Sequence, residues 1–461
     1  MTQKPGRNRR SFLGSALAAV PLLAVEGAHA APRPAAAAPS ATTVPAVHFG
    51  ITPSPDRDQT AQLQAAIDQT SAKGLGLELP PGRYVIGGLQ LRPGTRLLGA
   101  PGATVLSYNG IGLCVTAENA AGVRLEHVVM DGGDLPLDRA RTQALLAFRH
   151  CLNLQLTGLD VGASGANGIH LSSCSGRISD CDITSARDAG IWSQDADPAS
   201  GALVITGTTI SDCRDNGILI WRTTKGHDGS RVVDCTLRRI GNKSGGSGQY
   251  GNGINVFRAG NVAVANSRIS DCAYSAVRGN AADNIQMLGN SVARIGEVAL
   301  YAEFGFEGAM ISNNIVDGAA TGIAVTNFNE GGRLAVIQGN LIRNLVRREH
   351  ETVDKRGDGI AVEADAVVSN NVVEGAPTAG LMIGWGPHLR DVVASGNLIR
   401  ASRIGIAVSG TVGAGRCLIA NNMISGHSAG AIRAMDFGRV VGEELAGGTL
   451  TGPLRVIGNV G

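Results

Sequence analysis

The chain has 461 residues, of which 65 are glycine and only 3% are aromatic. Its formal charge is +2, because 40 Lys and Arg side chains nearly balance 38 Asp and Glu side chains. A near-neutral chain argues against a general nucleic-acid-binding protein. Beyond the N-terminal segment no apolar run approaches the length of a membrane span, so we expect no stable membrane anchor.

The N-terminal segment predicts export. Residues 8–13 resemble a twin-arginine export signal, and the residues that carry this resemblance are Arg9, Arg10, Phe12 and Leu13. A moderately apolar stretch follows to Val25, and Ala28-His29-Ala30 fits an A-x-A cleavage site. The apolar run is too short to span a bilayer and ends at Glu26, which excludes a membrane anchor.

These features divide the chain into three parts. We expect a signal peptide over 1–30, a flexible Ala/Pro-rich linker over 31–46, and one domain over 47–461. The twin-arginine translocase would then be a partner during export. The mature protein would be extracytoplasmic, most simply periplasmic, after cleavage near Ala30.

A short helix is predicted at the start of the domain. Asp58 can cap a helix in which Leu63, Ala66 and Ile67 share one face. Such a helix would close the open end of a repetitive core. Residues 58–68 and 79–84 resemble the opening segment of pectate-lyase-like right-handed parallel β-helices.

One short phrase, a small residue followed by a branched apolar residue, recurs along most of the domain, mostly in steps of 21 to 27 residues. The first residues of the phrase are Gly168, Gly190, Gly217, Gly253, Ala276, Ala299, Gly322, Gly359, Gly380, Gly405 and Ala431. A period in this range predicts a solenoid, because a single coil cannot bury its own apolar face. Together with the twin-arginine signal, the whole chain resembles a family of twin-arginine-translocated β-helical repeat proteins. That family has no assigned activity, so the resemblance implies fold and export but no chemistry.

Upstream of each phrase, two short apolar strands flank a column of asparagines. The column contains Asn290, Asn314, Asn340, Asn371, Asn397 and Asn422. Asparagines stacked at strand spacing predict an internal ladder of amide hydrogen bonds. Cys181 and Cys235 occupy the same position in earlier coils, and Cys213 and Cys272 share another column. Members of each pair lie two coils apart, about 9.6 Å, which is too far for a disulfide. We expect buried, stacked thiols.

The outward positions of the phrase are chemically varied only in the middle coils. There, aromatic and planar polar side chains gather in two neighbouring columns. The candidate substrate-binding residues are Trp192, Trp221, Asn255, Phe257 and Asn280. Such a strip suits a polysaccharide, since aromatic faces stack on sugar rings and polar groups bind hydroxyls. Alternatively, these aromatics pack under a loop of the chain, as Tyr250 could cover Trp221.

Two coils are lengthened before the phrase, by residues 242–250 and 347–356. Both insertions leave the coil at the same corner, so they could form walls beside the strip. The second insertion is rich in charge, and a solvated loop is the simpler interpretation.

Candidate catalytic residues follow from the chemistry of a uronic-acid lyase or epimerase, which needs a base and a cation for the carboxylate. The candidates are Tyr301, Arg278, Glu303 and His227. A hydrolase would need paired carboxylates, and Glu303 with Glu363, about 9.6 Å apart, is at the edge of that range. The paired-Asp and Gly-His-Gly signatures of polygalacturonases and the Trp-x-Asp-His motif of pectate lyases are absent.

The sequence therefore predicts an all-β fold: a single-stranded right-handed parallel β-helix with a short N-terminal capping helix. The leading hypothesis is recognition, and possible modification, of an extracytoplasmic polysaccharide along the strip. The alternative is a non-catalytic structural or adhesion protein of the cell envelope. No motif predicts a cofactor or a metal.

Overall fold

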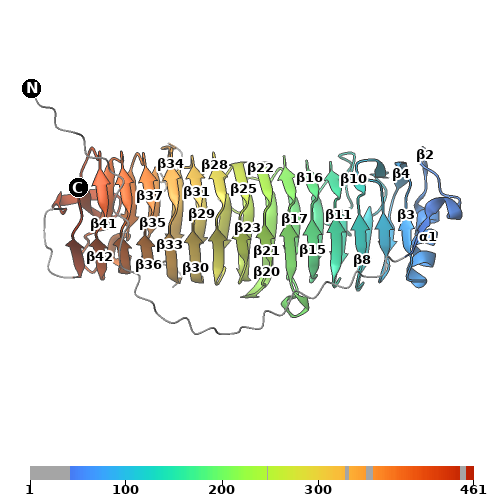
Figure 1. Cartoon of the computed structure of the whole chain (residues 1–461), viewed down its shortest axis with the longest axis horizontal. Coiled ribbons are helices and arrows are strands. Elements are labelled where there is room, and N and C mark those ends of the chain that lie inside the picture. The colour runs from blue at the N-terminus through green and yellow to red at the C-terminus, as the bar shows by residue number, and fades with distance from the viewer. Residues whose placement is uncertain (1–41, 247, 328–331, 349–356, 447–452) are drawn as a thin grey trace, which may run out of the picture. The chain divides into compact units, whose positions relative to one another are not determined.

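Each turn of the chain adds one strand to each of three long sheets, called A, B and C here. The computed structural model describes residues 42–246, 248–327, 332–348, 357–446 and 453–461, within a unit that spans Ala41–Gly461. The signal residues and most of the 31–46 linker lie outside the described residues. Figure 1 shows the strands stacked in sequence order, with the one α-helix of the described residues at the blue end.

Sheet A has 16 strands in the order of the chain. They are β1 (Thr43–Pro45), β3 (Gly76–Glu78), β6 (Arg96–Leu98), β9 (Arg124–Glu126), β12 (Leu154–Thr157), β15 (Gly176–Ser179), β18 (Leu203–Thr206), β21 (Arg231–Val233), β24 (Ala263–Ala265), β27 (Ile285–Leu288), β30 (Glu307–Ser312), β33 (Arg333–Gln338), β36 (Ala364–Ser369), β39 (Arg390–Ser395), β42 (Cys417–Ala420) and β46 (Leu454–Ile457).

Sheet B has 15 strands, also in chain order. They are β2 (Ser54–Asp58), β4 (Gly82–Ile86), β7 (Thr104–Tyr108), β10 (Val129–Asp131), β13 (Asp160–Gly162), β16 (Asp182–Thr184), β19 (Thr209–Ser211), β22 (Thr236–Ile240), β25 (Arg268–Cys272), β28 (Ser291–Ala293), β31 (Ile315–Asp317), β34 (Leu341–Arg343), β37 (Val372–Glu374), β40 (Leu398–Arg400) and β43 (Met423–Ser425).

Sheet C has 15 strands and contains the recurring phrase. They are β5 (Leu89–Leu91), β8 (Val115–Glu118), β11 (Ala144–Arg149), β14 (Asn167–Ser172), β17 (Ala189–Gln194), β20 (Asn216–His227), β23 (Asn252–Gly260), β26 (Val277–Asn280), β29 (Val298–Glu303), β32 (Thr321–Thr326), β35 (Asp358–Val362), β38 (Ala379–Ile383), β41 (Ile404–Ser409), β44 (Ile432–Asp436) and β45 (Arg439–Glu444). All pair in parallel except β45, which turns back antiparallel on β44. The predicted parallel β-helix is confirmed.

The phrase begins with a small residue because the adjacent coil leaves no room for a larger one. A Cβ atom added to Gly322 would lie 2.5 Å from the Gly359 carbonyl oxygen and 2.6 Å from Cγ2 of Ile342. The branched residue that follows points inward, and Ile323 is fully buried. The small residue is therefore required by close packing between sheets B and C. A larger residue at this position would force the two sheets apart.

The asparagine ladder is confirmed at the corner between sheets A and B. In Asn340, Oδ1 accepts hydrogen bonds from N and Nδ2 of Asn314, both at 3.0 Å. Its own Nδ2 donates to Oδ1 of Asn371 at 2.9 Å and to the Ile311 carbonyl at 3.0 Å. The ladder continues beyond the predicted column to Asn459. The eight cysteines of the chain are buried and free, as expected for thiols stacked in this core.

A helix closes the N-terminal end of the stack. The predicted capping helix is α1 (Thr60–Ala72), and it buries Leu63, Ala66 and Ile67. Its N-cap residue is Gln59 rather than Asp58, although Asp58 accepts a hydrogen bond from the Thr60 N–H at 2.8 Å. Strand β1 already pairs with β3, so the ordered stack begins within the range predicted as linker.

Candidate functional site

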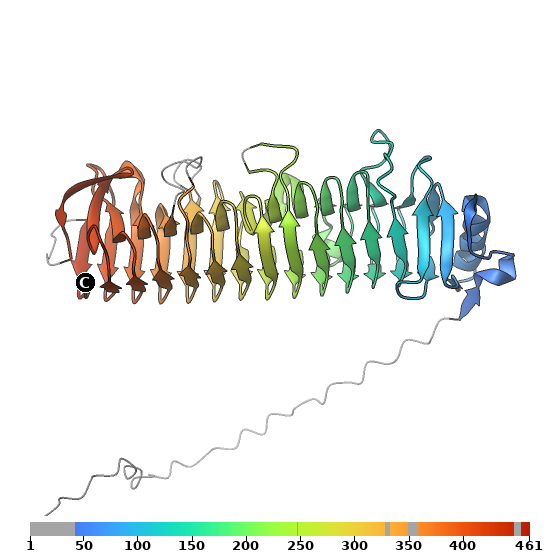
Figure 2. The same cartoon turned by 90° about the horizontal axis from the view of Figure 1, so that it is seen from above.

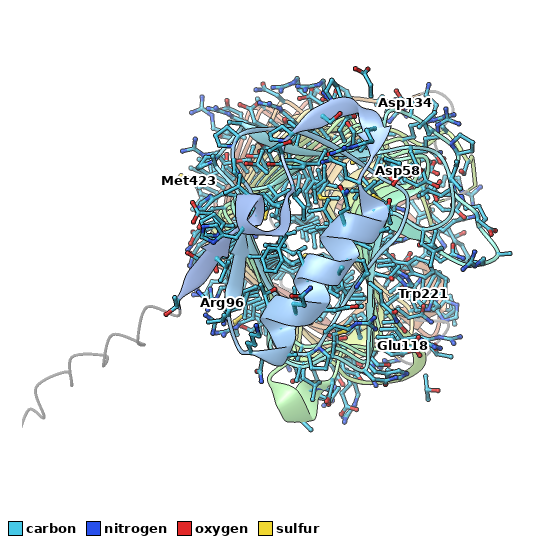
Figure 3. The ribbon with its side chains drawn as sticks, turned by 90° about the vertical axis from the view of Figure 1, so that its right-hand side faces the viewer. Asp58, Arg96, Glu118, Asp134, Trp221 and Met423 are labelled. Carbon is cyan, nitrogen blue, oxygen red and sulfur yellow. The ribbon has the colours of Figure 1, made fainter. Side chains whose placement is uncertain are left out.

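The strand register of sheet C aligns the two predicted outward columns. Trp192 pairs with Leu219, which pairs with Asn255, and that column continues through Arg278 to Tyr301. The second column contains Trp221, Phe257, Asn280 and Glu303. Towards the N-terminus the same column extends through Gln194, Ser172, Arg149 and Glu118. Figure 3, a view along the stack, shows Glu118 and Trp221 projecting from the same side.

Four rings form a continuous aromatic row on this face: His170, Trp192, Trp221 and Phe257. The centroids of His170 and Trp192 lie 4.4 Å apart in a stacked pair, and Trp192 lies 6.1 Å from Trp221. Phe257 meets Trp221 edge-on at 5.2 Å. Trp221 is 39% exposed, and Trp192 and Phe257 are partly exposed. Trp221 is therefore open to solvent, and Tyr250 does not bury it.

An open groove adjoins the N-terminal end of the aromatic row. Its volume is about 790 Å³, and it shares His170 and Ser172 with the row's first coil. Other lining residues include Gln90, Thr116, Glu118, Arg149 and Gln143. Glu118 and Arg149 form an ion pair across adjacent strands of its floor. This groove could not be predicted from the repeat, because the recurring phrase is recognisable only from Gly168 onward.

One wall of the groove is the connection 132–143, between β10 and β11. It leaves the stack at the same corner as the connection 241–251, between β22 and β23, and Figure 2 shows both rising from one edge. Arg139 fixes the wall, since its guanidinium forms an ion pair with Asp188 and donates to the Gly165 carbonyl at 3.1 Å. The connection 132–143 is long, like the two insertions predicted at 242–250 and 347–356. Its length was the feature of the sequence from which a third wall could have been predicted.

The structure brings together three of the proposed catalytic residues, but their contacts are with one another. Arg278 Nε donates to Oε1 of Glu303 at 2.5 Å, and Asn280 Nδ2 donates to the same oxygen at 2.8 Å. The Glu303 side chain is only 2% exposed. Its charge therefore neutralises Arg278, which is not available as a free cation for a substrate carboxylate. The same contact gives Asn280 a structural role.

Tyr301 is also poorly placed to act as a base. It is 3% exposed, and burial raises the pKa of its phenol well above the ordinary value, with further contributions from Glu303. It packs with Val298 and Ala324 beside a cavity of about 70 Å³ that Thr326 and Glu363 also line. A phenol in this environment stays protonated at neutral pH. The roles of Tyr301 as a base and of Arg278 as a carboxylate-binding cation stay predictions, and the burial of Tyr301 and the Arg278–Glu303 ion pair oppose them.

Asn255 is likewise covered, here by the first predicted wall. Its Nδ2 donates to the Gln249 carbonyl at 3.2 Å, and Asn216 donates to the same oxygen. Asp215 holds this loop down by accepting from N and Oγ of Ser244, at 2.8 Å and 2.6 Å. Asn255 thus anchors the loop, so its predicted role as a ligand contact is not supported.

His227 lies apart from the other candidates, at the far end of the long strand β20. It is exposed, and its Nδ1 lies 2.6 Å from Nδ2 of Asn261. Among the described residues, no hydrogen bond or ion pair joins it to Arg278, Tyr301 or Glu303. A shared catalytic role with those residues is therefore not supported.

Two predicted features remain, the Glu303–Glu363 pair and the second insertion. Glu363 accepts a hydrogen bond from the Asn327 N–H at 2.7 Å, while Glu303 is buried with Arg278, so the two do not form an open carboxylate pair. Residues 349–356 of the second insertion lie outside the described residues. Within the described ranges, no cluster of three His, Cys, Asp or Glu could hold a metal. No helix there is long and apolar enough to cross a membrane.

Comparison with known proteins identifies the fold. The family model described as "Right handed beta helix region" matches residues 223–399. None of the curated proteins matches the chain. A PL6 alginate lyase in complex with a trisaccharide aligns with a TM-score of 0.53 and 12% identity, over 91% of this chain and 94% of that one. The catalytic unit of a GH87 α-1,3-glucanase from Streptomyces thermodiastaticus aligns with a TM-score of 0.44 and 14% identity, over 92% of this chain and 69% of that one. The chain is a right-handed parallel β-helix.

Proposed function

We propose that the protein binds an extracytoplasmic glycan chain along the outer face of sheet C, from the groove near Gln90 to Phe257. The aromatic row carries this proposal. It holds four rings on consecutive coils, about 4.8 Å apart, beside an open groove with polar walls. Trp221 is exposed, and Trp192 and Phe257 are partly exposed. Rings so arranged offer flat apolar surfaces to successive sugar rings, while Gln90, Gln143 and Ser172 can bind hydroxyls.

Binding without chemistry fits the groups on this face best. Arg149 and Arg278 each have a carboxylate partner, and Tyr301 is buried. The alginate lyase of similar fold holds a trisaccharide, which shows that a parallel β-helix can bind an oligosaccharide. Of the predicted catalytic residues, Arg278 and Glu303 are paired with each other and Tyr301 is buried, so these three do not provide an exposed base beside a free cation. Recognition of a glycan, rather than its cleavage or epimerisation, is therefore our proposal for this face.

The three tryptophans of the chain supply a direct test. Trp192 and Trp221 lie in the aromatic row, whereas Trp385 packs edge-on against Phe437 at 5.6 Å, at the C-terminal end of the stack. Purified protein should bind at least one member of a panel of neutral and uronic-acid oligosaccharides, with a change in tryptophan fluorescence. Trp221→Ala should weaken binding at least about tenfold, and Trp385→Ala should leave it unchanged.

Two results would contradict the proposal: no binding across the panel, or equal weakening by Trp221→Ala and Trp385→Ala. The first result would favour the alternative, in which the β-helix serves as a rigid structural element of the envelope. Release of an unsaturated product would instead establish a lyase, and would contradict the non-catalytic assignment.

We also propose that the protein is exported by the twin-arginine route and belongs to the twin-arginine-translocated β-helical repeat proteins. The supporting observations are Arg9 and Arg10 in the motif over 8–13 and the A-x-A site at Ala28–Ala30. An extracytoplasmic location would place the sheet C face among envelope or extracellular glycans.

A further inference from the structure

On the outer face of sheet B, one column of side chains changes from polar to apolar between β28 and β31. The first outward position of its strands is polar from β13 to β28, where it is occupied by Asp160, Asp182, Thr209, Thr236, Arg268 and Ser291. In the next five strands the same position is aliphatic. We call these residues the aliphatic row: Ile315, Leu341, Val372, Leu398 and Met423.

Three residues of the aliphatic row are exposed in the single chain, and the other two, Val372 and Leu398, are partly exposed. Ile315 is 47% exposed, Leu341 37% and Met423 55%. The fold itself does not require apolar residues here, because the same column is polar in six earlier strands of the same sheet. A contiguous exposed apolar row on a flat sheet is typical of an interaction surface.

A row of alternating charges runs beside the aliphatic row and indicates the partner. Two residues further along four of these strands stand Asp317, Arg343, Glu374 and Arg400, so the charge alternates from coil to coil. Within the chain, Arg343 pairs with Asp317 at 2.8 Å and Arg400 with Glu374 at 3.0 Å. These side chains remain substantially exposed, which leaves them free to make further contacts.

We propose that two copies of the chain pair through these rows, about a two-fold axis that runs parallel to the strands between β34 and β37. Rotation about this axis reverses the order of the coils and keeps each column opposite itself. Leu341 then faces the partner's Val372, and Ile315 faces the partner's Leu398. In the charged row, Arg343 faces the partner's Glu374, and Asp317 faces the partner's Arg400.

The charge pattern selects this axis over its neighbours. If the axis passed through β37 instead, Arg343 would face the partner's Arg400 and Glu374 would face its own copy, which is repulsive. A lipid surface is a poorer occupant, since it would desolvate the carboxylates of Asp317 and Glu374 beside the aliphatic row. A second copy satisfies both rows at once, as an isologous interface requires.

The oligomeric state of the full chain tests this pairing. Sedimentation across a range of concentrations should show a species of twice the 47.2 kDa chain mass. Leu341→Glu should raise the dissociation constant at least about tenfold, because it places a carboxylate in the apolar row. Thr236→Glu, in the same column among the polar strands, is the matched control and should dimerise like the parent.

A charge exchange separates pairing between copies from stability within one copy. Arg343→Glu should weaken the dimer, because the new carboxylate faces the partner's Glu374. Adding Glu374→Arg should restore the dimer, because each pair across the axis is again of opposite charge. The Asp317–Arg343 pair within the chain stays broken in both variants. Arg343 and Glu374 are also in-register neighbours within one chain, so the two single variants are in addition mixed. Across the axis of a mixed dimer every pair is of opposite charge, whereas within each chain the pair stays like-charged, so a purely structural role would show no dimer in the mixture.

The proposal is overturned if the parent stays monomeric, if Leu341→Glu and Thr236→Glu behave alike, or if the exchange fails to restore the dimer. Glycan binding should be unchanged in all of these variants, because the aliphatic row and the aromatic row lie on different sheets. The pairing and the proposed function can therefore fail independently.

Discussion

At the scale of single residues, the structure separates side chains that face a ligand from side chains that hold the fold together. Trp192 and Trp221 could be assigned to the first class from the sequence, because alternation along a strand fixes which side chains point outward. Asn255 and Tyr301 point outward as well, yet a loop covers the first and the fold buries the second. Outward direction is set by local geometry, whereas exposure depends on contacts between coils that the sequence does not reveal.

His170 offers a prediction at this scale. Burial against Trp192 lowers the pKa of its imidazole to about 4, so the folded protein keeps the ring neutral. The unfolded chain binds a proton near pH 6.5, so His170 stabilises the fold fully above pH 6.5, and this stability is lost as the pH falls from 6.5 towards 4. The loss should reach at most about 3 kcal/mol.

Two measurements check the His170 prediction. NMR titration of the imidazole should give a pKa below 5, and His170→Gln should show a flatter dependence of unfolding free energy on pH between 6.5 and 4 than the parent. The signal of His150, which lies exposed in a bend after β11, has to be distinguished from that of His170 in the same spectra, for which His150→Gln can be used. A His170 pKa near 6.5 would contradict the burial of the ring.

At the scale of elements, the repeated positions were the most predictable part of the molecule. The inward branched residue and the asparagine ladder follow from periods of 2 and of one coil, which are visible in the sequence. The capping helix follows from the helical spacing of Leu63, Ala66 and Ile67. The connection 132–143 was not predicted, because its coil lacks the Gly-Ile phrase and so gave no reference point from which to count. The closing strand β45 was missed for a related reason: it turns back antiparallel and leaves the repeat.

The asparagine ladder should be among the most sensitive elements of the fold. Asn340→Ala would leave the Asn314 N–H, its Nδ2 and the Ile311 carbonyl without their buried partner. We expect a loss of about 2–4 kcal/mol in unfolding free energy by denaturant titration. Asn340→Ser should lose less, because Ser267 fills the equivalent position and accepts from the Cys235 N–H at 3.2 Å.

Gln338→Ala is the control for the ladder, because this side chain is exposed and lies two residues from Asn340. It should change the unfolding free energy by no more than about 0.5 kcal/mol. Equal effects of Asn340→Ala and Gln338→Ala would show that water replaces the buried ladder contacts.

At the scale of the whole molecule, the proposed export route can be tested by mutation of the arginine pair. If the twin-arginine proposal holds, replacement of Arg9 and Arg10 by Lys should retain the protein in the cytoplasm of a bacterial host. Arg7→Lys changes a neighbouring basic residue outside the arginine pair and should leave export intact. Fractionation followed by immunoblotting measures both. Export of the double Arg→Lys variant at the parental level would exclude the twin-arginine route.

Each strand pairs only with strands of the adjacent coils. Such a protein can therefore gain or lose whole coils. Excision or duplication of one coil, for example the 27 residues from Gly176 to Ala202, leaves every column aligned, because Gly176 and Leu203 are register partners. The binding face would then shorten or lengthen by about 4.8 Å, close to the rise of one sugar unit, without altering any remaining side chain. Selectivity for the length of a glycan can thus change by whole repeats, independently of selectivity for the identity of its sugars.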